Sequence, residues 1–189
     1  AWGVWENYLA QQNRDVLAYA APRLAAYLDW DARHRDRNGN SLLEWQIEGD
    51  RNCRSGESGM DNSQRFDEAL LLDAGDFSAF AALEMAYLAR MYDVLGDTGS
   101  AQAWRSRSSL LSGAVHQQLW NSKLGFYCDR KMDGTFSPVQ AVTGFLPLLL
   151  DDFPAERLPV LVTALQDESR FNTRFPLSSV AVSTPGWST

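Results

Sequence analysis

The stretch FSAFAALEMAYLARMYDVLG, residues 77–96, has the clearest helical pattern in the chain. Its large apolar residues recur every three or four positions, which predicts an amphipathic α-helix. Ser78 is expected to cap the N-terminus of this helix, and Gly96 is expected to end it. The stripe consists of Phe80, Leu83, Tyr87, Leu88, Met91, Tyr92 and Leu95.

Similar spacing on both sides of this stretch predicts five further helices. They are expected near residues 2–9, 17–28, 100–120, 139–150 and 155–168. Pro22 falls inside the second of them, where it is expected to kink or restart the helix. The chain is therefore predicted to be all-α.

The links between these helices alternate strictly between short and long. The short ones are residues 12–14, 96–99 and 151–154, and the long ones are 36–76, 121–137 and 169–189. If consecutive helices run antiparallel, every long link lies at the same end of the molecule. Long loops in a compact domain usually carry function, so we expect the site at that end.

Composition excludes several classes of partner. The chain has 189 residues, 45% of them hydrophobic, which suits one domain with a real core. The net charge is −7 and no basic run exceeds isolated pairs, which argues against nucleic acid and anionic membranes. The longest apolar stretch, 142–150, contains Pro147 and is too short to span a bilayer.

No signal peptide is expected at Ala1. The chain also lacks an initiating Met, so we expect a processed protein or a piece of a longer one. Cys53 and Cys128 are its two cysteines. Two free thiols in a reducing compartment, the cytoplasm, are favoured over a bridge, although a single bridge stays open.

No metal or cofactor is expected. Asp36, Asn38 and Asn40 resemble the start of a calcium loop that lacks its closing Glu, so a solvated turn is favoured. His34 and His116 lie on separate predicted helices and are interpreted as surface or packing residues. The segment GFYCDRKMDGTF, with the turn Asp133–Gly134, predicts a small β-hairpin over 126–136.

Polar groups are densest in ESGMDNSQRFD, residues 57–67. Carboxylates and amides bond sugar hydroxyls, aromatic faces cover the apolar side of a sugar ring, and a shielded carboxylic acid can protonate a glycosidic oxygen. The bland alternative is that residues 61–63 cap a short helix running through Phe66 and Leu70, and that Arg65 pairs with Glu57. On spacing alone, this alternative is favoured.

This segment resembles the signature of glycoside hydrolase family 63 and its relatives in the (α/α)6-toroid group, which includes the trehalases. Segments 4–17, 35–45, 119–130 and 183–187 resemble the same enzymes in the same order, so the resemblance covers 1–189. It implies a toroid of twelve helices in two rings, of which this chain holds about half. Residues 1–189 are then part of a single catalytic domain.

The resemblance also implies the chemistry. Asp61 would be the general acid of an inverting hydrolase acting on an α-glucoside or α-mannoside, and no general base can be carried over, because the family places it late in the toroid. Gly56 stands where many relatives have an aromatic residue, so one wall of the pocket is expected to differ. The predicted sugar-binding residues are Trp45, Glu57, Gly59, Asn62, Arg65 and Trp187.

Two other interpretations stay open. A helical-repeat interaction module would suit the hairpin at 77–120, but its pattern does not recur along the chain. A toroid sugar epimerase or lyase would need a His or Tyr base, and neither histidine falls in a long link. If the ring is incomplete, helices near 2–9 and 158–165 would expose apolar faces, which favours self-association or pairing with the missing half.

Overall fold

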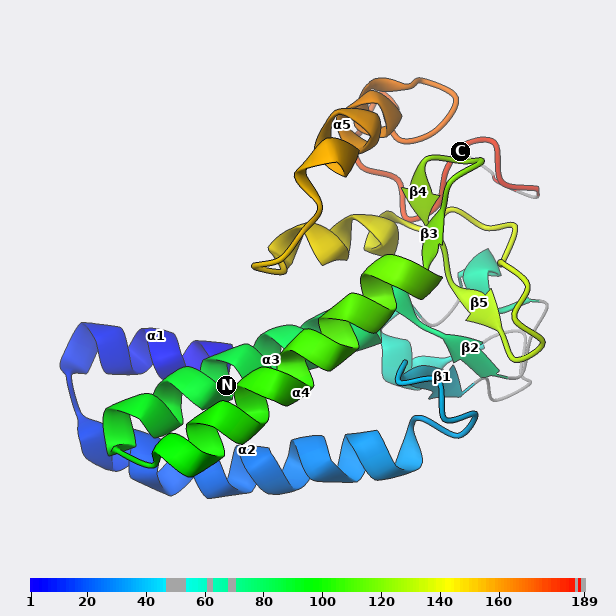
Figure 1. Cartoon of the computed structure of the whole chain (residues 1–189). Coiled ribbons are helices and arrows are strands. Elements are labelled where there is room, and N and C mark those ends of the chain that lie inside the picture. The colour runs from blue at the N-terminus through cyan, green and yellow to red at the C-terminus, as the bar shows by residue number, and fades with distance from the viewer. Residues whose placement is uncertain (47–53, 61–62, 68–70, 186, 188–189) are drawn as a thin grey trace.

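The computed structural model describes residues 1–46, 54–60, 63–67, 71–185 and 187. Helices dominate it, as predicted (Figure 1). They are α1 (Trp2–Gln11), α2 (Arg14–His34), α3 (Gly75–Leu95), α4 (Thr98–Gln118), α5 (Leu158–Gln166) and the 3-10 helices η1 (Gly56–Ser58), η2 (Gln64–Phe66), η3 (Val142–Leu149) and η4 (Ala155–Arg157).

The predicted helix over 77–96 is α3, but its start differs from the prediction. It begins at Gly75, with Ala74 as the N-cap residue, and Gly96 ends it at a φ of 85°. Ser78 is not the cap: it is buried one turn inside, where its hydroxyl accepts the main-chain N–H of Leu43 at 2.9 Å. The main-chain N–H groups of Gly75 and Phe77 donate instead to the carboxylates of Asp129 and Asp76. The capping role predicted for Ser78 is therefore wrong.

Two other helices depart from the prediction in form. Helix α2 is continuous through Pro22, which excludes the restart but not the kink that was predicted there, and its first turn is capped by Asn13, whose side chain accepts the N–H of Asp15. The segment predicted over 139–150 forms the 3-10 helix η3. Pro147 lies inside η3, and its missing N–H removes one bond that a full α-helix would need.

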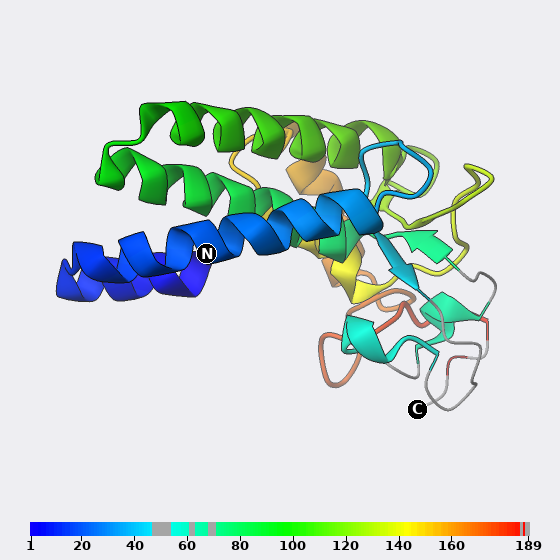
Figure 2. The ribbon, with the colours of Figure 1, turned by 90° about the horizontal axis from the view of Figure 1, so that it is seen from below.

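Two of the three predicted short links lie at the opposite end of the molecule from the small strands, as the alternation predicted, whereas the link 151–154 lies beside α3 (Figure 1). The α1–α2 and α3–α4 turns lie at one end, and the small strands lie at the other, in both views (Figures 1 and 2). We call the second the loop-rich end. No helix among the described residues is long and apolar enough to cross a membrane.

A small sheet that the sequence did not predict lies at the loop-rich end. Strand β2 (Leu71–Asp73) pairs antiparallel with β1 (Glu44–Gln46) on one side and with β5 (Arg130–Lys131) on the other. Strand β3 (Trp120–Asn121) pairs with β4 (Phe126–Tyr127). The predicted hairpin over 126–136 is confirmed around its turn at Gly134, where Arg130 and Phe136 form an antiparallel bridge. Its first residues, β4, pair with β3 instead.

The main core lies between α3 and the elements around it. Leu88 and Met91 of α3 are fully buried, as are Leu17 of α2 and Val115 of α4. Burying one such side chain contributes roughly 1.5–3 kcal/mol, so these residues are expected to contribute strongly to the stability of the helical body.

Apolar side chains are exposed on the outer helices. Trp2 and Leu9 of α1 are 41% and 48% exposed, and Leu158 of α5 is 47% exposed. Tyr19 and Tyr27 project from α2 in the same way. The predicted apolar edges near 2–9 and 158–165 are therefore present.

Candidate active site

The 57–67 segment reaches the loop-rich end, and its described residues are held on both sides of Asp61 and Asn62. Those two residues lie outside the described part of the chain, as does Cys53. On one side, Met60 donates its N–H to Ser58 Oγ at 3.0 Å and packs with Phe66, Leu72 and Trp45. On the other, Ser63 caps η2 by accepting the N–H of Arg65.

Gly59 supplies a backbone conformation that other residues disfavour. Its φ is +70°, in the left-handed region, and a Cβ there would meet nothing within 4 Å. The glycine is therefore needed for the turn after η1, not for space.

Glu57 forms an ion pair that the sequence did not indicate. Arg35, just past the end of α2, grips the carboxylate with both terminal nitrogens, Nη1 to Oε1 at 2.9 Å and Nη2 to Oε2 at 2.6 Å. Oε1 also accepts the N–H of Gln46 at 2.8 Å. The suggested Arg65–Glu57 pair is wrong, because Arg65 has other partners.

Arg65 lies beneath the segment, buried between two carboxylates. Its guanidinium donates to both oxygens of Asp76 at 2.7 Å each, to Asp129 Oδ1 at 2.8 Å, and through Nε to Asp129 Oδ2. All three residues are at most 5% exposed. Sugar binding by Arg65 stays a prediction, since its bonds to Asp76 and Asp129 are internal to the protein.

The N-terminus of α3 stabilises this cluster, which holds two negative charges against one positive. Asp129 accepts the N–H of Gly75 at 3.0 Å, and Asp76 accepts the N–H of Phe77 at 2.9 Å. The positive end of the helix dipole favours such carboxylates. Burial by itself would raise the pKa of Asp76, but Arg65 and the hydrogen bonds to it outweigh burial and lower it.

Trp45 lies half-buried on β1 beside this cluster. Its indole N–H donates to Asp76 Oδ1 at 2.9 Å, and its ring stacks on Phe77 with centroids 4.2 Å apart. Trp187, the other predicted aromatic, packs instead with Val139, Ala141 and Val180 in a second small cluster.

The turn after α2 is fastened to β2 by amide side chains. Asn38 and Asn40 donate to Asp73 at 3.1 and 2.7 Å, and Glu44 accepts the N–H of Arg37 at 2.8 Å. Burial raises the pKa of both Asp73 and Glu44, and these hydrogen bonds oppose the rise. Within the described ranges, no group of three or more His, Cys, Asp or Glu side chains could hold a metal ion.

The histidines and Cys128 have packing roles. His34 Nδ1 lies 2.8 Å from the Trp30 carbonyl, and His116 Nδ1 lies 2.8 Å from the Tyr127 hydroxyl. Cys128 is a free, buried thiol, and burial raises its pKa to about 12.

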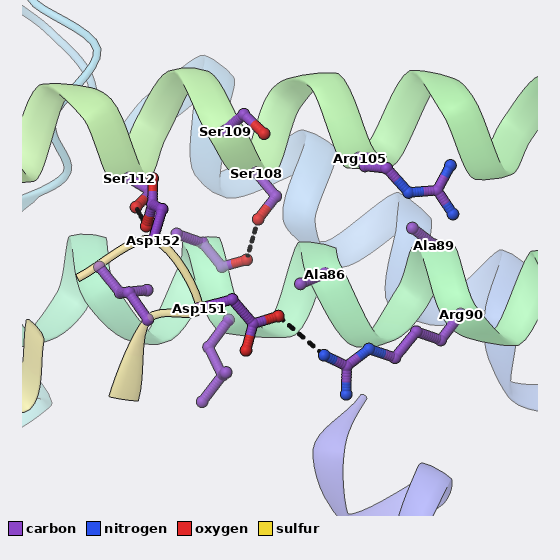
Figure 3. A pocket seen from close by; sticks show the side chains of 12 residues that line it. Ala86, Ala89, Arg90, Arg105, Ser108, Ser109, Ser112, Asp151 and Asp152 are labelled. Atoms are coloured by element: carbon purple, nitrogen blue, oxygen red, sulfur yellow. Dashed lines mark hydrogen bonds and ion pairs between the residues drawn. The ribbon is translucent and has the colours of Figure 1, made fainter. Parts of the chain in front are cut away.

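A cavity of about 200 Å³ opens along the helical body, between α3, α4 and Leu150–Asp152 (Figure 3). An Arg90–Asp151 ion pair at 2.8 Å crosses it, and Ser108 donates to the Ala82 carbonyl at 2.7 Å. None of the predicted site residues lines it. This cavity is therefore separate from the predicted site residues, and a site at the loop-rich end stays a prediction.

Sequence reasoning missed Arg35, Asp76 and Asp129. Asp129 lies between two short strands and Asp76 lies in the first turn of a helix. Neither position has a local sequence pattern that predicts pairing with Arg65. The one available signal was the acidic residue in the first turn of α3, which usually bonds helix amides.

Comparisons with known proteins agree with this architecture. The model of the mannosylglycerate hydrolase MGH1-like glycoside hydrolase domain matches residues 1–189. The GH63 mannosylglycerate hydrolase from Thermus thermophilus, solved with glucose, matches 98% of this chain and 54% of its own, at 21% identity and a TM-score of 0.80.

Two further matches are a solved structure and a curated sequence. A neutral trehalase from Saccharomyces cerevisiae matches 70% of this chain and 26% of its own, at 16% identity and a TM-score of 0.58. An uncharacterized protein from Borreliella burgdorferi is 22% identical over 189 residues, which are all of this chain and 37% of that protein. The predicted likeness in fold to GH63 hydrolases and trehalases is confirmed, and the chain spans about half of the mannosylglycerate hydrolase. The chain belongs to the family of mannosylglycerate hydrolase MGH1-like glycoside hydrolase domains.

Proposed function

We propose that the full-length protein hydrolyses α-glucosides or α-mannosides with inversion, and that Asp61 is its general acid. Small substrates, such as a glycosylglycerate or a disaccharide, suit the resemblance best. The observation that carries the proposal is the anchoring of the motif in a glycoside hydrolase domain. Met60 and Ser63, on either side of residues 61–62, are both held at the loop-rich end.

The general acid would protonate the leaving oxygen while a second carboxylate activates water on the opposite face of the sugar. Several described carboxylates near the motif are paired with cations, whereas Glu44 and Asp73 accept hydrogen bonds from uncharged N–H groups. Glu57 is bound by Arg35, Asp67 by Arg54, and Asp76 by Arg65. These pairings favour a general base from outside this chain, which matches 54% of the related mannosylglycerate hydrolase.

Hydrolysis is favoured over an epimerase or lyase activity by the placement of the histidines. His116 is buried against Tyr127 and its Nε2 lies 3.3 Å from Asp152, and His34 bonds the Trp30 carbonyl of its own helix. Both rings are engaged within the protein, which disfavours either of them as the base of such an activity.

The test replaces Asp61 by Asn in the full-length protein. The rate on glycosides with poor leaving groups should fall about 10²–10⁴-fold, and activated aryl glycosides should lose much less, because their leaving groups need no proton. Asp67→Asn is the matched control: it lies in the same segment and is bound by Arg54, so its rate should change little. Equal losses on both substrate types in Asp61→Asn would refute the acid role.

We also propose that the exposed apolar edges on α1 and α5 are covered by further helices, either a second copy or the missing half of the ring. Trp2, Leu9 and Leu158 support this. Light scattering of the isolated 189-residue chain should show association, and a well-behaved monomer would refute it.

A cytoplasmic location is proposed as well, supported by the free thiol of Cys128. Fractionation of cells that express the protein tests that location.

A further inference from the structure

We propose that Arg65 and Asp76 are positioning residues that fix the indole of Trp45 as a platform for a sugar ring. The inference rests on the proposed function. It assigns Arg65 an indirect role in place of direct substrate contact.

Asp76 is the point where the contacts meet. Its Oδ1 accepts hydrogen bonds from the Trp45 indole at 2.9 Å, from Arg65 Nη2 at 2.7 Å and from the Phe77 amide at 2.9 Å. Its Oδ2 accepts Arg65 Nη1 at 2.7 Å. One carboxylate therefore links β1, η2 and the start of α3, with Trp45 31 residues and Arg65 11 residues from Asp76.

Two contacts restrain the Trp45 ring. The N–H bond to Asp76 sets the direction of the ring edge, and the Phe77 ring, inclined by only 16°, covers one face. Trp45 is only half-buried, and the platform role requires that its accessible part include the ring. A fixed aromatic surface with an accessible part is what a sugar ring stacks on.

Main-chain contacts connect this platform to the motif. Gln46, next to Trp45, donates its N–H to Glu57, and its carbonyl accepts Ser55 Oγ at 3.1 Å. Met60 packs in the same small apolar cluster as Trp45. The ring and the described flank of the motif are therefore linked by direct contacts.

Arg65 is needed because it keeps Asp76 charged. Hydrogen bonds to an ionised acceptor are roughly twice as strong as neutral ones. Without the guanidinium, Asp76 would be a buried carboxylate beside the carboxylate of Asp129. Burial and the repulsion between the two negative charges would then both favour protonation of one of them. The Trp45 indole donates to Asp76 and not to the guanidinium. Loss of Arg65 would therefore weaken this hydrogen bond indirectly, because a protonated Asp76 is a weaker acceptor.

The test uses full-length protein labelled with 5-fluorotryptophan. The ¹⁹F resonance of Trp45 is identified by its absence in Trp45→Phe, which keeps an aromatic ring but removes the indole N–H and the five-membered ring. Arg65→Lys and Asp76→Asn should shift or split that resonance. Asp29→Asn, which removes the exposed Asp29–Arg107 pair in the helical body, is the control and should leave it unchanged.

Activity and sugar binding separate positioning from the proposed function. Methyl α-glucoside or methyl α-mannoside should shift the Trp45 resonance in the wild type. Trp45→Phe and Arg65→Lys should each raise KM about 10-fold, the scale of a hydrogen bond to a charged group, with kcat much less affected. A Trp45 resonance that is unmoved in both Arg65→Lys and Asp76→Asn would overturn the positioning role.

If the variants move the resonance but neither sugar does and the wild type shows no turnover, the proposed function fails and the platform role fails with it. If Arg65→Lys lowers kcat as much as it changes KM while Trp45→Phe changes neither, Arg65 acts elsewhere and the inference is overturned.

Discussion

The helical body and the loop-rich end are stabilised by different physical means. The body is a continuous apolar core in which Leu88, Met91 and Val115 are fully buried. The loop-rich end has a much smaller apolar cluster, centred on Phe66 and Leu72, and relies on Arg65 with its two carboxylates. Apolar packing has no preferred direction, whereas the ion cluster holds specific atoms at specific places. The end that carries the candidate site therefore has the more directional interactions.

The sharpest way to test this contrast is to remove one central side chain from each region. Arg65→Met should cost about 3–5 kcal/mol at pH 7, because it leaves two buried carboxylates without their cation. Leu88→Ala should cost about 2–5 kcal/mol through lost burial and the cavity it leaves. Urea denaturation at neutral pH measures both free energies of unfolding.

The two losses should differ in their pH dependence. Arg65 lowers the pKa of Asp76 in the folded protein, so this stabilisation is present above the unfolded pKa and is lost as the pH falls. In Arg65→Met the carboxylates take up protons more readily, and the penalty should shrink towards pH 4. The Leu88→Ala penalty should not follow this trend. The same pH dependence for both variants would contradict the distinction.

The junction between the two regions is the next place to test. Gly144 of η3 lies so close to β4 that an added Cβ would overlap the Phe126 ring and the Tyr127 carbonyl. Gly144→Ala should cost about 1–3 kcal/mol through overpacking. Gly113→Ala is the control, since its Cβ would meet only Gln117 Nε2 at 4.0 Å inside α4, and it should stabilise by about 0.5–1 kcal/mol. Thermal unfolding midpoints that move in the same direction would contradict this account.

The smallest expected effect concerns a carboxylate that lies in the helical body. Asp31 of α2 is 2% exposed, and burial raises its pKa from 3.8 to about 6, although Arg35 opposes the rise. The folded state then binds a proton more tightly than the unfolded state. Stability should therefore fall as the pH rises from about 4 to 6 and stay lower above that.

Asp31→Asn should remove this slope and stabilise the protein at pH 7 by about 1–2 kcal/mol, since one pKa unit corresponds to about 1.4 kcal/mol. Asp29→Asn, on the same helix but exposed and paired with Arg107, should change stability by less than about 1 kcal/mol. Urea titrations at several pH values from 4 to 7 check both. A stability loss at pH 7 in Asp31→Asn would show that the charged form is stabilised by the fold.

The sequence by itself determined the helical body. The apolar periodicity of α3, the ending at Gly96 and the alternation of short and long links are local or nearly local signals. They were sufficient to predict a loop-rich end and to place Trp45, Glu57 and Arg65 in its segments. They were misleading where a distant group replaced a local one, as at Ser78, whose capping role falls to the side chains of Asp76 and Asp129.

Only the tertiary structure decided how the groups at the loop-rich end pair. Arg65 meets Asp129, 64 residues away, and Glu57 meets Arg35, 22 residues away. The sheet of β1, β2 and β5 likewise joins strands of two or three residues, too short to show a period-two pattern. A charge in the sequence has many possible partners. The choice follows from which helix ends and loops the packed core brings together, because a buried charge is tolerated only beside its partner.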